Sequence, residues 1–255
     1  MTDPHPLFGR REAIGRLLAS FILVAMAREA RAFAPAGDTR ARRWIEGQQD
    51  IAEALAAGRI GGLAWATEVE RLAAEIDPAE LMALVRRSSV LPAPTASHND
   101  PQKRYVRFLD EAGQPRRLAY GVALFEFAPR NVITPHGHQH MVSAHMVVEG
   151  RFRVRNFDRV GDEEGAMLVR PTRDYVVDHG HVSTMCDERD NIHWFVPQGG
   201  PATTFDVVIS GLTPGAPDHV IQAIDPQRAA RRQDGTLRAP LIDFAESSRR
   251  YTADV

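Results

Sequence analysis

PHGHQHMVSAH, residues 135–145, holds four of the ten histidines of the 255-residue chain. His136 and His138 are separated by one residue, and on an extended segment residues i and i+2 point to the same side. Both imidazoles can then reach one ion, so the pair predicts a metal site on a β-strand. The competing interpretation is a turn in which the two rings only cap backbone groups.

The residues around this stretch alternate with the period of two that is typical of β-strands. Short β-branched or aromatic runs follow one another over residues 103–212, separated by Gly, Pro and Asp turns. Many short strands at this spacing predict an all-β fold, an antiparallel sandwich or barrel. The runs are YVRFLD, RLAYGVALFEFA, SAHMVVEGRFRVRNF, GAMLV, DYVVDH, NIHWFV and TTFDVVIS.

The segments on either side of the predicted barrel differ in pattern. Residues 42–87 predict three helices, the last of which opens with Asp77 as N-cap and Pro78 at the first helical position. Residues 88–102 are rich in Pro, Ser and Asn and predict a linker. Residues 37–102 therefore form a helical extension with its linker. Residues 213–255 predict one strand, at 219–224, and a tail that packs on the barrel.

Residues 1–36 have the order of a signal peptide: a basic region, a short apolar core and small residues at the end. The arginine pair Arg10 and Arg11 predicts a twin-arginine export signal and a periplasmic location. Arg28 and Arg31, which lie inside the cleavage region, favour the alternative of an amphipathic helix in a cytoplasmic protein.

Composition excludes several classes of function. The formal net charge of -2 argues against nucleic acid as a partner, since such proteins normally show a basic excess. No apolar run reaches the roughly 18–20 residues that span a bilayer, so an integral membrane protein is not expected. Cys186 is the single cysteine, which excludes an intramolecular disulfide and a cysteine-rich zinc site.

Two features outside the opening stretch complete a pattern. Gly150 follows His138 by twelve residues, at a position where a tight turn would join two strands, and His193 lies far downstream in NIHWFV. An H-x-H pair, a strand ending in Gly and a histidine on a later strand resemble the cupin family of double-stranded β-helix barrels. The resemblance implies a jelly-roll barrel in which His136, His138 and His193 bind one metal ion.

Many metallocupins carry a glutamate ligand five residues after the second histidine, and here that position is Ser143. A hydroxyl is a poor ligand for Fe(II) or Mn(II), so three neutral imidazoles remain. Such a site keeps the full charge of a divalent metal and has open coordination positions. It favours anionic ligands, and a thiolate is the obvious one, which points to thiol substrates and oxygen chemistry.

Among cupins, the chain is similar over about residues 120–212 to the thiol dioxygenases of the plant cysteine oxidase and cysteamine dioxygenase group. The matching positions are Met141, Gly150, Val154, Phe157, Asp158, Asn191, Ile192, His193 and Phe195. The resemblance implies Fe(II) on three histidines, a small-molecule or peptide thiol and O2 as substrates, and a sulfinate as product. Asp206 corresponds to the family's aspartate close to the iron. The family's active-site tyrosine falls near Leu212 and is absent.

His145 and Asp206 are the candidate catalytic residues beside the metal. His145 is expected to support a ligand or contact the substrate, and Asp206 to hydrogen-bond a ligand histidine or a substrate amine. One alternative is a metallocupin lyase or isomerase that uses Mn, Ni or Zn, with His140 or His145 as a fourth ligand. The other alternative is a cupin that binds a metal or ligand without turnover.

Overall fold

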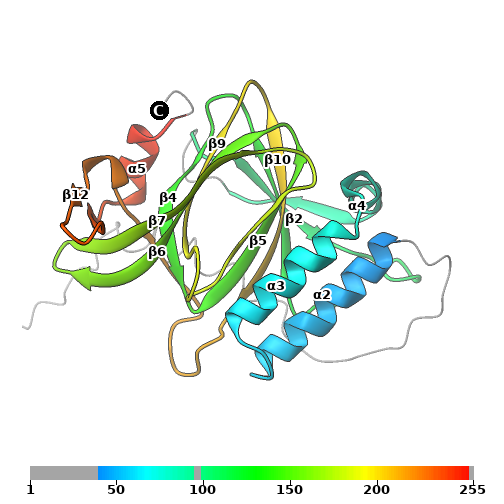
Figure 1. Cartoon of the computed structure of the whole chain (residues 1–255). Coiled ribbons are helices and arrows are strands. Elements are labelled where there is room, and N and C mark those ends of the chain that lie inside the picture. Colours follow the sequence, from blue (N-terminus) through cyan, green and yellow to red (C-terminus); the bar gives the residue numbers. More distant parts are fainter. Residues whose placement is uncertain (1–39, 95–98, 253–255) are drawn as a thin grey trace, which may run out of the picture.

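The structure, a computed structural model, describes residues 40–94 and 99–252 (Figure 1). Two antiparallel sheets of six and seven strands form its centre, and helices precede them. The predicted all-β barrel with an N-terminal helical extension is confirmed. The predicted signal peptide lies outside the described residues. Among the helices of the described ranges, none is both long and apolar enough to cross a membrane.

Three helices open the described chain: α2 (Arg40–Ala56), α3 (Gly62–Ala74) and α4 (Pro78–Val85). α4 begins as predicted, because the Asp77 carboxylate accepts a 2.8 Å hydrogen bond from the Ala79 amide and Pro78 follows it. α2 and α3 lie side by side against the six-stranded sheet (Figure 1). Trp44 of α2 meets Phe205 of that sheet edge to face, with ring centroids 5.4 Å apart.

The strands of the two sheets follow the helices. The six-stranded sheet has the order β1-β2-β3-β10-β5-β8, and the seven-stranded sheet has the order β11-β4-β9-β6-β7-β13-β12. Their bounds are β1 (Ser89–Pro92), β2 (Gln102–Arg107), β3 (Gly121–Phe127), β4 (Ile133–Gln139), β5 (Met141–Glu149), β6 (Phe152–Glu163), β7 (Ala166–Val177), β8 (Val182–Met185), β9 (Ile192–Pro197), β10 (Ala202–Ser210), β11 (Val220–Ala223), β12 (Ala230–Arg231) and β13 (Leu237–Pro240).

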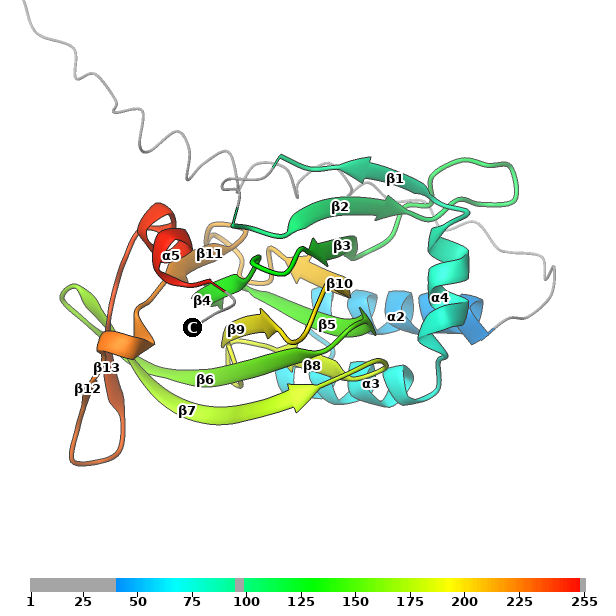
Figure 2. The ribbon, with the colours of Figure 1, turned by 90° about the horizontal axis from the view of Figure 1, so that it is seen from above.

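Eight of these strands form nested antiparallel pairs, namely β3 with β10, β4 with β9, β5 with β8 and β6 with β7. From β3 to β10 the chain alternates between the two sheets, except at the β6–β7 hairpin. A long hairpin wound in this way is a jelly roll, the double-stranded β-helix of cupins. Seen from above, the two sheets face each other across the barrel (Figure 2).

Alternation along the strands determines which side chains face the barrel interior. The even-numbered residues 142–148 of β5 belong to the apolar core under α2 and α3, so Ser143 and His145 face the interior. On β10, Val207 belongs to the same core, and Asp206 therefore points inward. The helices thus cover the outer face of the sheet whose inner face carries these polar groups.

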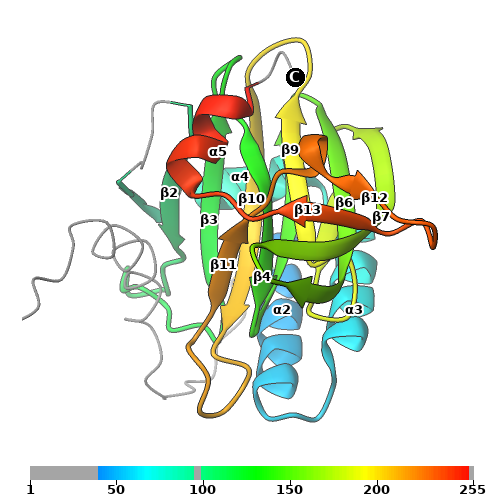
Figure 3. The ribbon, with the colours of Figure 1, turned by 90° about the vertical axis from the view of Figure 1, so that its left-hand side faces the viewer.

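The C-terminal segment contains more regular structure than predicted. β11 confirms the strand predicted at 219–224, and the β12–β13 hairpin extends the seven-stranded sheet beyond β7. A further helix, α5 (Phe244–Arg250), lies beside β11 and β4 (Figure 3). After α5, the buried Tyr251 donates a 2.7 Å hydrogen bond to Asp225 and packs edge to face on Trp194. The segment is therefore anchored to the barrel.

Two sequence predictions about strands are wrong. Residues 88–102 are not simply a linker, because β1 lies within them and pairs with β2, with Pro92 opposite Arg104. An edge strand tolerates proline, which is why the composition misleads here. GAMLV and DYVVDH, predicted as separate strands, form one strand, β7, which passes Pro171 at a register shift opposite the step from Asn156 to Phe157.

Gly150 provides a test of the predicted turn between β5 and β6. It has a φ of 72°, and a Cβ at this position would lie 2.7 Å from the carbonyl oxygen of Pro201. Gly150→Ala is expected to lower the free energy of unfolding by about 2 kcal/mol or more, because it combines left-handed backbone with overlap. Gly161→Ala in β6 is the matched control, since its Cβ would meet only Leu168, at 3.6 Å. Urea denaturation of both variants measures the difference, and equal losses would contradict the prediction.

Candidate metal centre

Three histidines converge in the barrel interior from two neighbouring strands. His136 and His138 lie on β4, and His136 is directly opposite His193 of β9. One ring nitrogen from each of the three lies within 4.8 Å of the others. Gly137 between the first two faces the other way, where a Cβ would come within 3.0 Å of Ile192. The predicted trio is therefore brought together and could hold a metal ion.

The distances from His193 Nε2 to the other two Nε2 atoms fit imidazoles that bind one and the same divalent ion. His193 Nε2 lies 3.1 Å from His136 Nε2 and 3.4 Å from His138 Nε2. Two imidazole nitrogens bound to one ion at about 2.1 Å and about 90–110° apart are about 3.0–3.4 Å from each other. The two distances that involve His193 are therefore those expected of imidazoles bound to one tetrahedral or octahedral ion.

The other ring nitrogens of His136 and His138 fix which nitrogen is free to bind metal. His136 Nδ1 lies 2.7 Å from the Thr134 carbonyl oxygen, and His138 Nδ1 lies 3.0 Å from the Met141 sulfur. Both partners only accept, so each Nδ1 carries the proton and each Nε2 has a free lone pair. Hydrogen bonds of this kind orient ligand histidines in metal sites.

The surroundings keep the trio uncharged. Burial lowers the pKa of His136 to about 4, although the Thr134 carbonyl opposes this effect. Burial, together with the neighbouring histidines, also places the pKa values of His138 and His193 well below the ordinary value. Metal binding requires neutral imidazole, so the site needs no proton release near neutral pH.

Asp158 and Asn191, two residues that match the thiol dioxygenase pattern, hold the loop before β9 in place by hydrogen bonds. The Asn191 side-chain oxygen accepts a 2.9 Å hydrogen bond from the Arg159 amide, and the Asp158 carboxylate accepts one of 2.8 Å from the Asp190 amide. Both bonds join β6 to the residues immediately before His193. Asp158 and Asn191 therefore position the third histidine, and the Asn191 backbone oxygen also accepts a 3.0 Å hydrogen bond from the His138 amide.

A row of hydrogen-bonded polar side chains on the six-stranded sheet faces the trio. Asp206 Oδ2 accepts a 2.7 Å hydrogen bond from His145 Nδ1, and Ser143 Oγ lies 3.0 Å from His145 Nε2. In a neutral His145 ring whose Nδ1 donates to the carboxylate, Nε2 accepts a hydrogen bond from the serine hydroxyl. The His145 and His193 rings meet with centroids 4.7 Å apart. All three members of this row are almost fully buried.

This arrangement corrects two expectations. The sequence predicts a bond from Asp206 to a ligand histidine or a substrate amine; Asp206 Oδ2 is bonded to His145 and not to one of the three converging histidines, and the bond to a substrate amine stays a prediction. His140 is not a fourth ligand: it lies in the turn between β4 and β5 with a φ of 64°, and its Nδ1 is 2.9 Å from the Thr213 hydroxyl. Both ring nitrogens of His145 are engaged, so it does not join the convergent set either.

Buried polar atoms without partners mark the interior around the trio. Within the described residues, His193 Nδ1, Asp206 Oδ1, Thr204 Oγ1 and both amide atoms of Asn156 have none. Asn156 lies opposite His193 on β6 and is 1% exposed. Unpaired buried groups are costly, so these atoms are available to hydrogen-bond ordered water or a polar ligand.

Sequence reasoning missed three residues that belong to this region: Asn156, Lys103 and Phe244. Asn156 and Lys103 reach it only through strand register. Phe244 begins α5 and lies over the half-buried His136, with ring centroids 5.8 Å apart. A signal was available for Lys103, because it is the only lysine of the chain. No comparable signal marks the other two.

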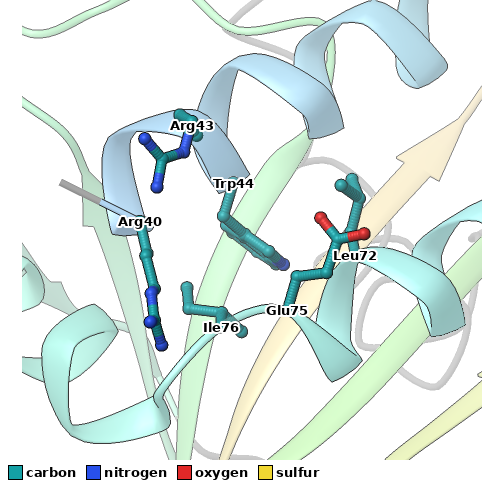
Figure 4. A pocket seen from close by; sticks show the side chains of 6 residues that line it. All are labelled: Arg40, Arg43, Trp44, Leu72, Glu75 and Ile76. Carbon is teal, nitrogen blue, oxygen red and sulfur yellow. The ribbon is translucent and has the colours of Figure 1, made fainter. Parts of the chain in front are cut away.

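Two other features lie apart from the trio. A surface pocket between α2 and α3 contains no histidine and is on the outer side of the six-stranded sheet (Figure 4). It is lined by Arg40, Arg43, Trp44, Leu72, Glu75 and Ile76. Burial, reinforced by Glu188, raises the pKa of the buried Cys186 thiol to about 12, so this cysteine is not a reactive thiol near neutral pH.

Comparison with known proteins assigns neither a family nor an activity to the chain. No protein-family model and no curated protein matches the chain. An uncharacterised conserved protein with a double-stranded β-helix domain from Klebsiella pneumoniae is similar, at 16% identity, over 50% of this chain and 88% of its own, with a TM-score of 0.32. A recombinant oxalate oxidase in complex with glycolate is 22% identical over 52% and 61%, with a TM-score of 0.35.

KdgF from Halomonas sp. is also similar, at 16% identity over 45% of this chain and 82% of its own, with a TM-score of 0.31. Similarities this weak assign no activity to this chain. They also do not distinguish the thiol dioxygenase group from other cupins, so that finer resemblance stays a prediction from the sequence.

Metal content tests the ligand set directly. His136→Ala, His138→Ala and His193→Ala are each expected to lose stoichiometric Zn(II), because two imidazoles do not make a stable site. His140→Ala is expected to retain it, since that ring bonds Thr213. Elemental analysis after loading and gel filtration, with circular dichroism as a folding control, gives the answer. Full metal retention by the His193 variant would refute the assignment.

The depressed pKa values predict how the metal-free protein responds to acid. Unfolded histidines take up protons near pH 6.5, whereas folded His136 does so only near pH 4. The unfolded state therefore binds more protons in this window, and the free energy of unfolding should fall as the pH drops from about 6.5 to about 4. His136→Asn should show a smaller fall in urea titrations of the apo protein. An identical fall in both proteins would contradict the burial of a neutral imidazole.

Proposed function

We propose that this chain is a non-haem Fe(II) dioxygenase that oxidises a thiol to a sulfinate at His136, His138 and His193. The observation that carries the proposal is the donor set: in the described part of the chain, three neutral imidazoles converge without a carboxylate among the ligand atoms. Ser143, at the position where many cupins have a glutamate, hydrogen-bonds His145 instead.

The charge of such a site supports an anionic substrate. Three neutral imidazoles leave the 2+ charge of the ion uncompensated by its protein ligands. His138 is 7% and His193 is 2% exposed, and low polarity around them strengthens attraction between charges. A thiolate suits this site, because it carries a negative charge and binds metal ions well.

When bound, Fe(II) would supply the redox chemistry that joins both atoms of O2 to a thiolate, RS⁻ + O2 → RSO2⁻. The residues of the chain would handle the proton that a thiol must lose first. His145 Nε2 is the basic atom, and the Ser143 hydroxyl connects it to the interior. Asp206 stabilises the positive charge on His145 after proton transfer, in the manner of an aspartate behind a catalytic histidine.

Oxygen consumption tests the proposed activity. Protein purified without oxygen and loaded with Fe(II) should consume O2 when given a thiol from a panel of cysteine, cysteamine, 3-mercaptopropionate and Cys-initiated peptides. The product should be a sulfinate, 32 mass units above the thiol by mass spectrometry, about the mass of two oxygen atoms. Absence of thiol-dependent oxygen uptake in iron-loaded protein would exclude the dioxygenase and favour a non-oxidative metallocupin or a binding protein.

The role of His145 is tested separately from metal binding. His145→Gln is expected to retain one metal ion per chain but to lower kcat/KM by about 100-fold, the usual loss when an acid–base group is removed. The loss should shrink at high pH, where the thiol ionises without help. His179→Gln, in an exposed loop, is the control and should behave as the wild type. Loss of metal by the His145 variant would mean that it is a ligand.

A further inference from the structure

Lysine is nearly absent from this protein. The chain has 31 basic residues other than histidine, and Lys103 is the only lysine among them. Arginine and lysine differ physically: guanidinium is planar and broad, whereas an ammonium is a compact point charge on a flexible stem. Lys103 therefore places the one compact ammonium charge of the chain at its position in β2.

Strand register places Lys103 on the inner face of the six-stranded sheet. Lys103 of β2 is directly opposite Phe125 of β3, and Phe125 is opposite Thr204 of β10. This row is next to the one that contains Asp206 and His145. Arg104, the following residue, pairs with Glu126 at 2.7 Å on the other face. Lys103 therefore points into the half of the barrel interior that faces the metal trio.

The contacts of the Lys103 ammonium hold it in place without neutralising it. Its Nζ lies 4.8 Å from the ring centroid of Tyr105 and 5.4 Å from that of Phe125, which are cation–π distances. Among the described residues it makes no ion pair, and the side chain is half-buried. A half-buried cation without a carboxylate partner is available to bind an anionic ligand.

The electrostatic reach of Lys103 extends to the metal side. Burial is the main reason for the lowered pKa of His138, with smaller contributions from neighbouring histidines, and the Lys103 charge adds to it. The same charge also lowers the pKa of His219, which lies just before β11. This agrees with the strand register, which places Lys103 on the inner face of the six-stranded sheet. Asp206, in the neighbouring row, forms its ion pair with His145 and not with Lys103.

We propose that Lys103 is the anchor for a carboxylate group of the substrate, so that the substrate class is a small thiol that also carries a carboxylate. The inference rests on the proposed function, because the thiolate end is assigned to the ion held by the trio. A divalent ion and an ammonium together favour a ligand with two negative charges. The unpaired amide of Asn156 and hydroxyl of Thr204 provide further hydrogen-bonding groups between the two sheets.

Binding to zinc-loaded full-length protein tests the anchor without requiring turnover. 3-Mercaptopropionate and 2-mercaptoethanol share the thiol and differ in the carboxylate. Lys103→Met is expected to weaken 3-mercaptopropionate at least tenfold in calorimetric titrations and to leave 2-mercaptoethanol within twofold. Arg104→Met is the matched control on the opposite face of the same strand and should change neither. Equal affinities of wild type and Lys103→Met for 3-mercaptopropionate would overturn the proposal.

The uniqueness of Lys103 permits a second measurement on the wild-type protein. An acylating reagent can modify only this side-chain amine and the α-amino group, and peptide mass spectrometry separates the two. 3-Mercaptopropionate should protect Lys103 in the zinc-loaded protein, whereas 2-mercaptoethanol should not. Protection by both thiols, or by neither, would overturn the proposed role of Lys103. The same holds if borohydride traps an imine between Lys103 and an added 2-oxo acid, because the amine would then act as a nucleophile and not as a carboxylate anchor.

These outcomes are distinct from failure of the proposed activity. If zinc-loaded protein binds 3-mercaptopropionate through Lys103 but iron-loaded protein takes up no oxygen with it, the anchor holds and the dioxygenase fails. If iron-loaded protein oxidises cysteamine as well as 3-mercaptopropionate, and Lys103→Met does not alter that ratio, the dioxygenase holds and the anchor fails.

Discussion

The site depends on three uncharged imidazoles that lie close together on a buried strand pair. The Nε2 atom of His193 is 3.1 Å from that of His136 and 3.4 Å from that of His138. Lone pairs at this distance repel unless a proton or a cation lies between them. With Nδ1 of His136 and His138 protonated, only His193 has a proton to offer, and it can reach only one of the two. A divalent cation would satisfy all three at once.

The two sheets contribute different groups to the site. The seven-stranded sheet provides the three histidines and the Asp158 and Asn191 bonds that set the entry to β9. The six-stranded sheet provides His145, which the proposed function makes a proton acceptor, and the positive charge of Lys103. Helices α2 and α3 bury the outer face of that second sheet, so its polar groups are concentrated on the inside. The bound substrate would lie between the metal-binding histidines of the seven-stranded sheet and His145 and Lys103 of the six-stranded sheet.

The sequence predicts the parts of this arrangement that depend on spacing within one strand. His136 and His138 share a face because they are two residues apart, and Gly150 is needed where a Cβ would meet the backbone of Pro201. Features set by pairing between distant strands are not predictable in this way. The hydrogen bond from His145 to Asp206 depends on the β5–β10 register, and Lys103 reaches the interior through β2 and β3. Composition also hid β1, because proline is acceptable on an edge strand.

The central claim is that His136, His138 and His193 alone provide the protein ligands of one divalent metal ion. X-ray absorption spectroscopy of the full-length protein loaded with Fe(II) under anaerobic conditions tests it most directly. The account predicts multiple-scattering features for three imidazoles at about 2.0–2.2 Å, no sulfur from the protein, and oxygen ligands only from exchangeable water. A spectrum with two or fewer imidazoles, or with four, would contradict it.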